Sequence, residues 1–302
     1  MKPLALTILL LFVASASPAQ QSAVPRPKIL GISHVRFHVT SLPSSLPFYQ
    51  DIVGLNPDAH ACTNLPALKC FRVSATQVVQ LDPRDWDRPN DLLEELGFSI
   101  SNVKAMRKFL EANGLKPDPI ANNAAGKPSV SFVDSEGHRV VFEHPEKGAL
   151  AANPHQVSRS LIHAGFVIQD RAAADHLYKD ILGFHLYWQG GMNETDINWV
   201  AMQVPDGVDW LEYMLRISPT ADHHTYGVMY HISLGVTDIH AAQKQLVANG
   251  WIPKEEPKVG RDGKWQLNLY DPDDTRIEFM EFTPKEKPCC SEFTGTHPSP
   301  KP

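Results

Sequence analysis

Two side chains that can bind a metal ion lie on strand-like segments near the end of the chain. His231 opens the alternating segment 231–236, and Glu278 lies in a second alternating segment within 271–281. Successive side chains of a strand point to opposite faces, so both residues lie opposite the apolar face of their strand. Histidine and carboxylate are common ligands of divalent transition metals. We therefore predict that His231 and Glu278 bind a metal ion.

Composition limits the partners of the protein. The chain has 302 residues, 42% of them hydrophobic, which is enough for a large core and for two domains. Its formal net charge is −6 and it has no basic run, which argues against a nucleic-acid partner.

The N-terminus predicts export from the cytoplasm. Lys2 precedes an apolar run over residues 4–13, and small residues then lead to a cleavage position after Ala19. We expect residues 1–19 to be a signal peptide and the mature protein to be secreted or periplasmic. Because no later segment is long and apolar enough to cross a bilayer, we expect no membrane span in the mature chain.

The four cysteines fall into two pairs. Cys62 and Cys70 flank a turn-like stretch and are suited to a local disulfide in an oxidising compartment. Cys289 and Cys290 are adjacent in a proline-rich tail, where we expect them to be poorly placed to pair with each other without strain. Neither pair has the spacing of a zinc site.

The chain repeats itself. Residues 177–184 closely copy residues 48–55, and residues 246–250 copy residues 110–114. The repeating unit is one strand, one helix and about three strands, and it occurs four times. We therefore predict an α+β fold built from paired βαβββ units, two units to each half.

The same pattern predicts the boundaries along the chain. After the signal peptide we expect a linker, a first domain, a second linker, a second domain and a proline-rich tail, at residues 20–29, 30–146, 147–158, 159–283 and 284–302.

Three recurring sequence words resemble the vicinal oxygen chelate superfamily, which includes glyoxalases, bleomycin-resistance proteins and extradiol dioxygenases. They are the His-x-x-x-x-Val type of first strand, the Phe/Leu-Tyr-x-Asp-Ile-x-Gly helix end and the Asp-Pro-Asp-x-x-x-Ile-Glu finish. The resemblance covers residues 30–283. It implies a curved sheet in each half, with a metal ion bound on the concave side.

The resemblance also implies a ligand set. Carried over position by position, it adds His163 and Glu212 to His231 and Glu278. This set suits a divalent ion such as Fe, Zn, Ni, Co or Mn. The first half departs from the pattern.

In the first half His34 is kept, but the matching positions are Gln80, Glu95 and Val141. Since valine cannot be a ligand, we expect a degenerate site in the first domain.

Three functions remain open for a protein with this set. Four ligands resemble a glyoxalase-type lyase or isomerase, in which the metal chelates adjacent oxygens of a small substrate and stabilises an enediolate, with Glu212 or Glu278 as catalytic base. Three ligands, His163, His231 and Glu278, resemble an extradiol non-haem Fe(II) ring-cleaving dioxygenase. The third alternative is a non-enzymatic protein that binds a small molecule, as bleomycin-resistance proteins do.

Two residues outside the ligand set are candidates for substrate contact. His224 and Tyr226 lie just ahead of the strand that begins at His231. The expected partner is a small-molecule substrate, and the sequence is compatible with a monomer or a homodimer.

Overall fold

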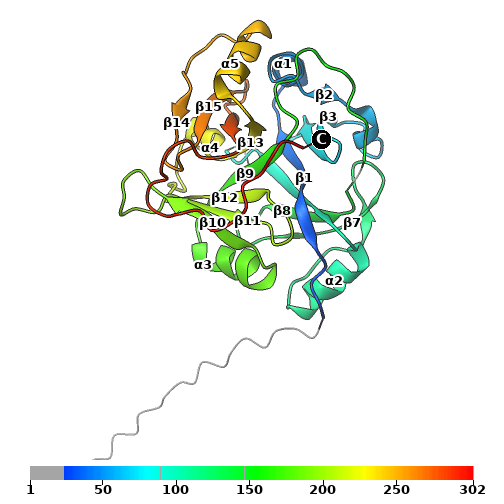
Figure 1. The fold of residues 1–302 in the computed structure, drawn as a ribbon. Helices are drawn as coiled ribbons and strands as arrows, with labels where there is room; N and C mark the ends of the chain where they lie inside the picture. Colours follow the sequence, from blue (N-terminus) through cyan, green and yellow to red (C-terminus); the bar gives the residue numbers. More distant parts are fainter. Residues whose placement is uncertain (1–23, 89, 146, 302) are drawn as a thin grey trace, which may run out of the picture.

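A computed structural model describes residues 24–88, 90–145 and 147–301 of the chain. The predicted signal peptide, residues 1–19, lies outside the described residues. The chain forms two eight-stranded sheets that lie side by side (Figure 1), in the strand orders β2-β3-β4-β1-β5-β8-β7-β6 and β10-β11-β12-β9-β13-β16-β15-β14.

The first sheet and its helices come from the N-terminal half. The strands are β1 Ile29–His38, β2 Asn56–Pro57, β3 Lys69–Ser74, β4 Gln77–Asp82, β5 Leu93–Ile100, β6 Ala121–Asn122, β7 Pro128–Val133 and β8 Arg139–Glu143. The helices are α1 Leu42–Pro47, the π-helical η1 Phe48–Ile52, the 3₁₀ helix η2 Ala59–Cys62 and α2 Val103–Ala112.

The second sheet and its helices come from the C-terminal half. The strands are β9 Leu161–Ile168, β10 His185–Gly190, β11 Trp199–Gln203, β12 Trp210–Leu215, β13 His231–Val236, β14 Lys258–Val259, β15 Trp265–Tyr270 and β16 Arg276–Glu281. The helices are α3 Arg171–Ala174, the π-helical η3 Asp175–Ile181, α4 His223–Met229 and α5 Ile239–Ala248.

The two sheets have the same pairing at their centres. In the first, β1 pairs with β4 in parallel and with β5 antiparallel, and β5 pairs with β8 in parallel. In the second, β9, β12, β13 and β16 pair in the same way. The α+β fold of repeated βαβββ units is therefore confirmed. Each sheet curls, and we call the concave side of the second sheet the cup.

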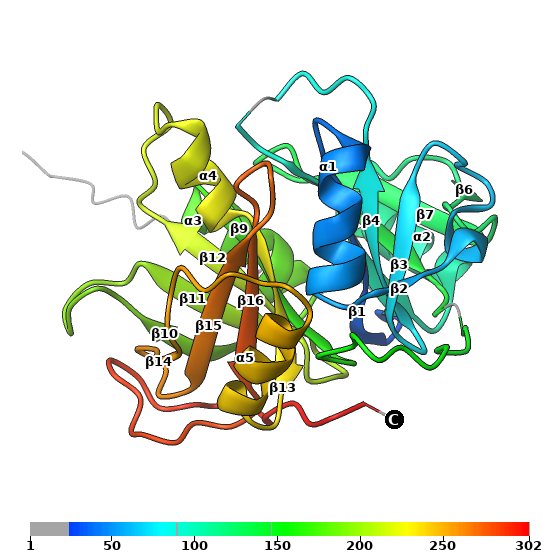
Figure 2. The ribbon, with the colours of Figure 1, turned by 90° about the horizontal axis from the view of Figure 1, so that it is seen from above.

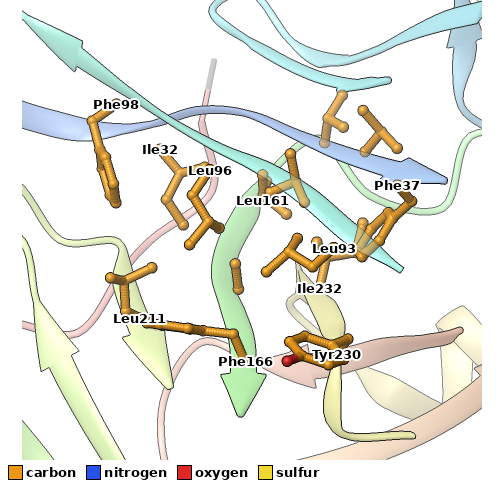
Figure 3. Packing of buried hydrophobic residues seen from close by; sticks show 14 of the residues in the cluster. Ile32, Phe37, Leu93, Leu96, Phe98, Leu161, Phe166, Leu211, Tyr230 and Ile232 are labelled. Atoms are coloured by element: carbon orange, nitrogen blue, oxygen red, sulfur yellow. The ribbon is translucent and has the colours of Figure 1, made fainter. Parts of the chain in front are cut away.

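Both halves share one hydrophobic core. Figure 3 shows Ile32 and Phe98 of the first sheet packed in the same cluster as Leu161, Leu211 and Ile232 of the second. All five side chains are at most 2% exposed. Burying this apolar surface between the sheets stabilises the contact between the halves.

Two hydrogen bonds between the halves are reciprocal. Tyr49, in the first half, donates to Asp271 in the second at 2.9 Å. Tyr178, in the second half, donates to Asp134 in the first, also at 2.9 Å. Both tyrosines are buried. Each half therefore places a helix tyrosine on an aspartate of the other half's last β-turn.

The structure contains two disulfides among its described residues. One joins Cys62 to Cys70, the pair predicted from the sequence. The other joins Cys289 to Cys290, the neighbours that we expected to be poorly placed to pair without strain. Both sulfurs of the second pair lie in the C-terminal tail, which runs along the second half past β10 and β14 (Figure 2). In the part of the chain that is described, no helix combines the length and apolar character needed to cross a membrane.

Candidate metal centre

The four central strands of the second sheet carry the candidate ligands. His163 lies on β9, Glu212 on β12, His231 on β13 and Glu278 on β16. Strand register brings them together, because Gly165 pairs with both Glu212 and His231, and Ser233 pairs with both His163 and Glu278. Side chains that alternate with the packed apolar face therefore converge in the cup.

Three of these side chains form one close group. His163, His231 and Glu278 each offer a ligand atom within 4.8 Å of the other two. The two Nε2 atoms are 3.1 Å apart, and Glu278 Oε2 lies 3.3 Å from His163 Nε2. Two ligands at right angles around an ion, each bonded at about 2.1 Å, would be about 3 Å apart. The spacing therefore fits neighbouring positions around one metal ion.

Glu212 stands beside this group. Its Oε2 atom is 3.2 Å from His231 Nε2 and 3.9 Å from His163 Nε2. It does not belong to the group of described residues whose ligand atoms all lie within 4.8 Å of one another. Glu212 is thus close enough to His231 for both to bind the same ion. Its side chain is less buried than those of His163, His231 and Glu278.

The protonation of the group suits a cation. Burial lowers the pKa of His163 well below its usual value, and burial together with Arg276 lowers the pKa of His231. Both rings are therefore neutral, which is the form that binds metals. The Nδ1 atom of His231 lies 3.0 Å from the Met229 carbonyl oxygen, which assigns the proton to Nδ1 and leaves a lone pair on Nε2.

Glu278 is a buried carboxyl with too little neutralising charge around it. Burial, together with the negative charges of Glu212 and Asp262, raises its pKa to about 8 even though Arg276 acts in the opposite direction. Its Oε2 atom has no hydrogen-bond partner among the described residues. A divalent ion would supply the missing positive charge.

Gly165 makes room for the group. A Cβ atom at this position would come within 1.8 Å of the His231 ring. Any larger residue would therefore displace a candidate ligand. The neutral histidines, the unpartnered carboxylate oxygen and the space over Gly165 together fit a divalent metal ion held by His163, His231 and Glu278.

Arg276 is a charged group that the sequence reasoning missed. It lies on β16, two residues before Glu278, and its Nη2 atom is 2.8 Å from His231 Nε2. The same Nη2 atom is 2.9 Å from His231 Nδ1, so the guanidinium lies beside both ring nitrogens, and its positive charge would oppose a metal ion at Nε2. Arg276 could have been found from its spacing, because residues two apart on a strand lie on the same face, here the face of Glu278.

A cavity of about 310 Å³ opens in front of the group. Glu212, Glu278 and Arg276 line it together with apolar side chains that include Trp188, Trp199, Met192, Met214 and Met229. The predicted substrate contacts lie elsewhere. His224 is exposed beside Asp274, and Tyr226 stacks on Tyr230 and lines a separate cavity.

Lys264 is a buried cation close to the candidate ligands. Its ammonium group is fully buried, 3.1 Å from the Tyr187 hydroxyl and 4.6 Å from the centre of the Trp210 ring. Burial lowers its pKa to about 8. Phe293, from the C-terminal tail, covers the ammonium group from outside. Sequence reasoning missed this residue because its cover comes from a distant segment.

The central strands of the first sheet pair in the same way but carry different side chains. His34 lies between two carboxylates, with Nε2 at 2.7 Å from Glu95 and Nδ1 at 2.8 Å from Glu143. Arg36 pairs with both oxygens of Glu95, at 3.1 and 3.0 Å, and donates to Gln80 at 2.9 Å. Although burial opposes it, pairing with Glu143 and Glu95 raises the pKa of His34 to about 9.

Comparison with known proteins places the second half in a family. Residues 160–279 match the model of the Glyoxalase/Bleomycin resistance protein/Dioxygenase superfamily. A lactoylglutathione lyase of Haemophilus influenzae is 27% identical over 123 residues, which are 40% of this chain and 91% of that protein. The second half of the chain is therefore similar to this superfamily, as its sequence words indicated.

Solved structures extend the likeness to the whole fold. Homoprotocatechuate 2,3-dioxygenase from Brevibacterium fuscum, in a complex with 3,4-dihydroxyphenylacetate, has a TM-score of 0.64 at 17% identity and covers 87% of this chain and 83% of its own. The 2,3-dioxygenase LapB from Pseudomonas sp. KL28 has a TM-score of 0.66 at 15% identity, with 91% and 96% covered. At this identity the likeness concerns the two-domain fold.

Proposed function

We propose that the protein is a metal-dependent enzyme of the glyoxalase-like lyase or isomerase type. The observation that carries this proposal is the position of Glu212. A second carboxylate, 3.2 Å from His231 Nε2, gives the site four candidate ligands from four central strands. Three-ligand sites for dioxygen need only one carboxylate.

In this proposal His163, His231 and Glu278 hold the ion, and Glu212 moves a proton. When bound, a divalent ion would act as a Lewis acid and polarise two adjacent oxygens of a small substrate. Glu212 lines the cavity and lies at the edge of the close group, so its carboxylate is free to take a proton from a substrate carbon and return it to the neighbouring carbon.

An extradiol dioxygenase is the second candidate. The close group of two histidines and one carboxylate has the composition of a non-haem iron site that binds dioxygen. The likeness to two solved dioxygenases supports the fold of this alternative but not its chemistry. Small-molecule binding without catalysis remains the outcome if neither reaction occurs.

Metal content tests the common basis of both enzyme functions. The purified protein is reconstituted separately with Fe(II), Ni, Zn and Co, and its metal content is measured after desalting. We expect about one ion per chain in the wild type and none in His231→Ala. His240→Ala, which changes an exposed histidine on α5, is the matched control. Equal metal content in His231→Ala and wild type would contradict both enzyme functions.

Activity assays then separate the two chemistries. The lyase function predicts anaerobic conversion of the hemithioacetal of methylglyoxal and a small thiol, or of a related hydroxy-ketone. Glu212→Gln should lower kcat by at least about a hundredfold while retaining metal. Oxygen uptake with catechols by the iron form, unaffected by Glu212→Gln, would favour the dioxygenase instead.

We also propose that the mature protein acts outside the cytoplasm. The predicted signal peptide and the two disulfides support this location, because disulfides persist in oxidising compartments. Fractionation of cells that produce the full chain tests it, with the protein expected in the periplasmic or secreted fraction.

A further inference from the structure

The C-terminal tail closes the gap between the two outer strands of the second sheet. The sheet ends in β10 on one side and β14 on the other. Cys289 donates its amide to the Arg261 carbonyl in the turn after β14, at 2.8 Å, and its own carbonyl accepts from Trp188 Nε1 on β10, at 3.2 Å. Cys289 is thus hydrogen-bonded to both edges of the gap.

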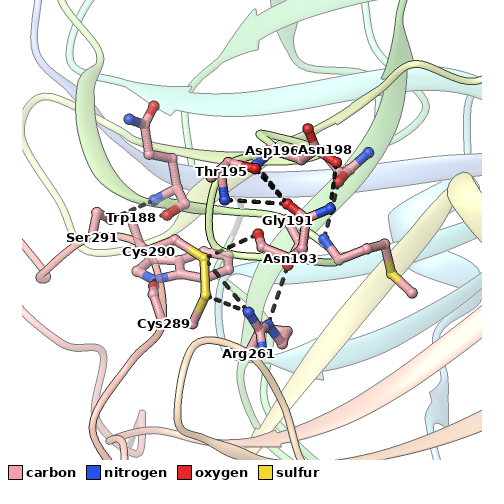
Figure 4. Close-up of a disulfide and its surroundings, with 12 residues drawn as sticks. Trp188, Gly191, Asn193, Thr195, Asp196, Asn198, Arg261, Cys289, Cys290 and Ser291 are labelled. Atoms are coloured by element: carbon pink, nitrogen blue, oxygen red, sulfur yellow. Dashed lines mark hydrogen bonds between the residues drawn. A yellow bond between two sulfur atoms is a disulfide. The ribbon is translucent and has the colours of Figure 1, made fainter.

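The disulfide at this gap faces solvent on one side and an arginine on the other. Figure 4 shows the Arg261 guanidinium beside the paired sulfurs. Its Nη2 atom is 2.7 Å from Cys289 Sγ and 3.9 Å from Cys290 Sγ. Cys290 is exposed, and the pair lines an open hollow of about 830 Å³ together with Lys287. A small thiol can therefore reach Cys290.

The positive charge of Arg261 favours the reduced form of the pair. A guanidinium beside a sulfur stabilises its thiolate, and a thiol with a lower pKa is the better leaving group in thiol–disulfide exchange. No ion pair with a carboxylate is recorded for Arg261 in the described parts of the chain, and its other side-chain bonds are to the Gly191 carbonyl and the two sulfurs. Glu194, Glu286 and Glu292 line the same hollow, but it is the Cys289 sulfur that accepts from the guanidinium, at 2.7 Å.

We propose that Cys289–Cys290 is a thiol-exchange site that a small dithiol reductant reduces. One thiolate of the reductant attacks Cys290 Sγ, the bond between the two cysteines breaks, and Cys289 leaves as a thiolate beside Arg261. The second thiolate of the reductant then attacks the mixed disulfide and releases Cys290. The protein gains two electrons and, on protonation, two thiols, while the reductant becomes a disulfide.

The other disulfide is an internal control for this reactivity. Cys62 and Cys70 are 4% and 5% exposed. They lie in a small apolar cluster with residues such as Leu68 and Ala124. Because exchange requires access to a sulfur, this buried pair should resist a reductant that opens the tail pair.

Alkylation in dithiothreitol buffers of defined composition, followed by peptide mass spectrometry, tests the proposal. We expect Cys289 and Cys290 to be reduced and alkylated in the folded protein under conditions that leave Cys62–Cys70 intact. Arg261→Gln should lower the equilibrium constant for reduction of the tail pair about tenfold. Arg261→Lys should restore most of it, and Lys287→Gln, in the same hollow, should change it less than about twofold.

Equal reduction of both disulfides, or an unchanged constant in folded Arg261→Gln, would overturn the exchange site.

Discussion

The first sheet fills its centre with Arg36, whereas the second has Gly165 at the equivalent position. Arg36 pairs in register with Gln80 and Glu95, and Gly165 with Glu212 and His231. The guanidinium of Arg36 is hydrogen-bonded to both of its register partners, whereas the space over Gly165 is taken by the His231 ring. The same backbone therefore surrounds a built-in cation in one half and a candidate metal site in the other.

The charges show why the two centres behave differently. In the first half, protonated His34 and Arg36 balance Glu95 and Glu143, and although burial opposes it, Arg36 and His34 lower the pKa of Glu95. In the second half, Glu278 is left with a raised pKa. The first half supplies its cations from its own side chains, Arg36 and protonated His34, which pair with the carboxylates. In the second half Arg276 and Lys264 are also close, yet the pKa of Glu278 stays raised, so this half is the better place for a further cation.

Placing an arginine in the second half should have the largest effect. In Gly165→Arg, the new side chain must displace the His231 ring and brings its own positive charge to Glu278. We expect metal binding to be abolished, and Gly165→Ala, whose Cβ already meets the ring, to weaken it at least about a hundredfold. Metal titration with a competing chelator measures both. Stoichiometric binding by Gly165→Arg would break the comparison.

Removing the arginine of the first half should destabilise the fold. Arg36→Met leaves Glu95 buried without its strongest partner, which should cost about 3–5 kcal/mol of unfolding free energy. Urea denaturation at neutral pH measures this cost. Arg139→Met is the control, because Arg139 and its partner Asp118 are both exposed, so its loss should cost at most about 1 kcal/mol. Similar costs for the two variants would contradict a central role for Arg36.

The first half should also show a pH dependence of stability. The pKa of His34 is 6.5 when unfolded and about 9 when folded, so the folded state holds the proton more tightly. This contribution is fully present below pH 6.5 and is lost as pH rises through about 9. It should amount to roughly 3 kcal/mol. Unfolding free energies measured from pH 6 to 10 should fall in the wild type, and His34→Gln should lack this component.

The smallest expected effect concerns the competing guanidinium of the second half. Arg276→Met removes a positive charge next to the candidate ligands and frees His231 Nε2. We expect metal affinity to rise about tenfold. Lys258→Met is the control, since Lys258 lines the same cavity but pairs with Glu255. Unchanged or weaker binding by Arg276→Met would show that the arginine supports the site.

The sequence could predict the repeated fold and the convergence of three side chains. Alternation placed His231 and Glu278 on strands, and the family resemblance added His163. The register of β9, β13 and β16 then brings the three side chains together. Whether Glu212 joins them depends on one side-chain rotamer, which a pattern of types does not determine. Arg36 was overlooked because its role depends on two carboxylates brought in by other strands.

The tail could not be predicted for a similar reason. The pairing of Cys289 with Cys290 and the cover of Lys264 by Phe293 depend on how a proline-rich segment with little periodicity docks on a finished sheet. Local spacing predicted a poor disulfide, and only the contacts with β10 and the turn after β14 explain where the segment lies. Long-range docking of this kind leaves no signature in the residues themselves.

The reciprocal tyrosines make the two halves resemble subunits of an isologous dimer. Tyr49 reaches Asp271 and Tyr178 reaches Asp134, so each half offers the other the same donor and the same acceptor. We therefore expect the two halves to associate through this interface even when no peptide bond joins them. A chain nicked within residues 147–158 should reassemble from its two fragments, which makes the fold suitable for fragment complementation.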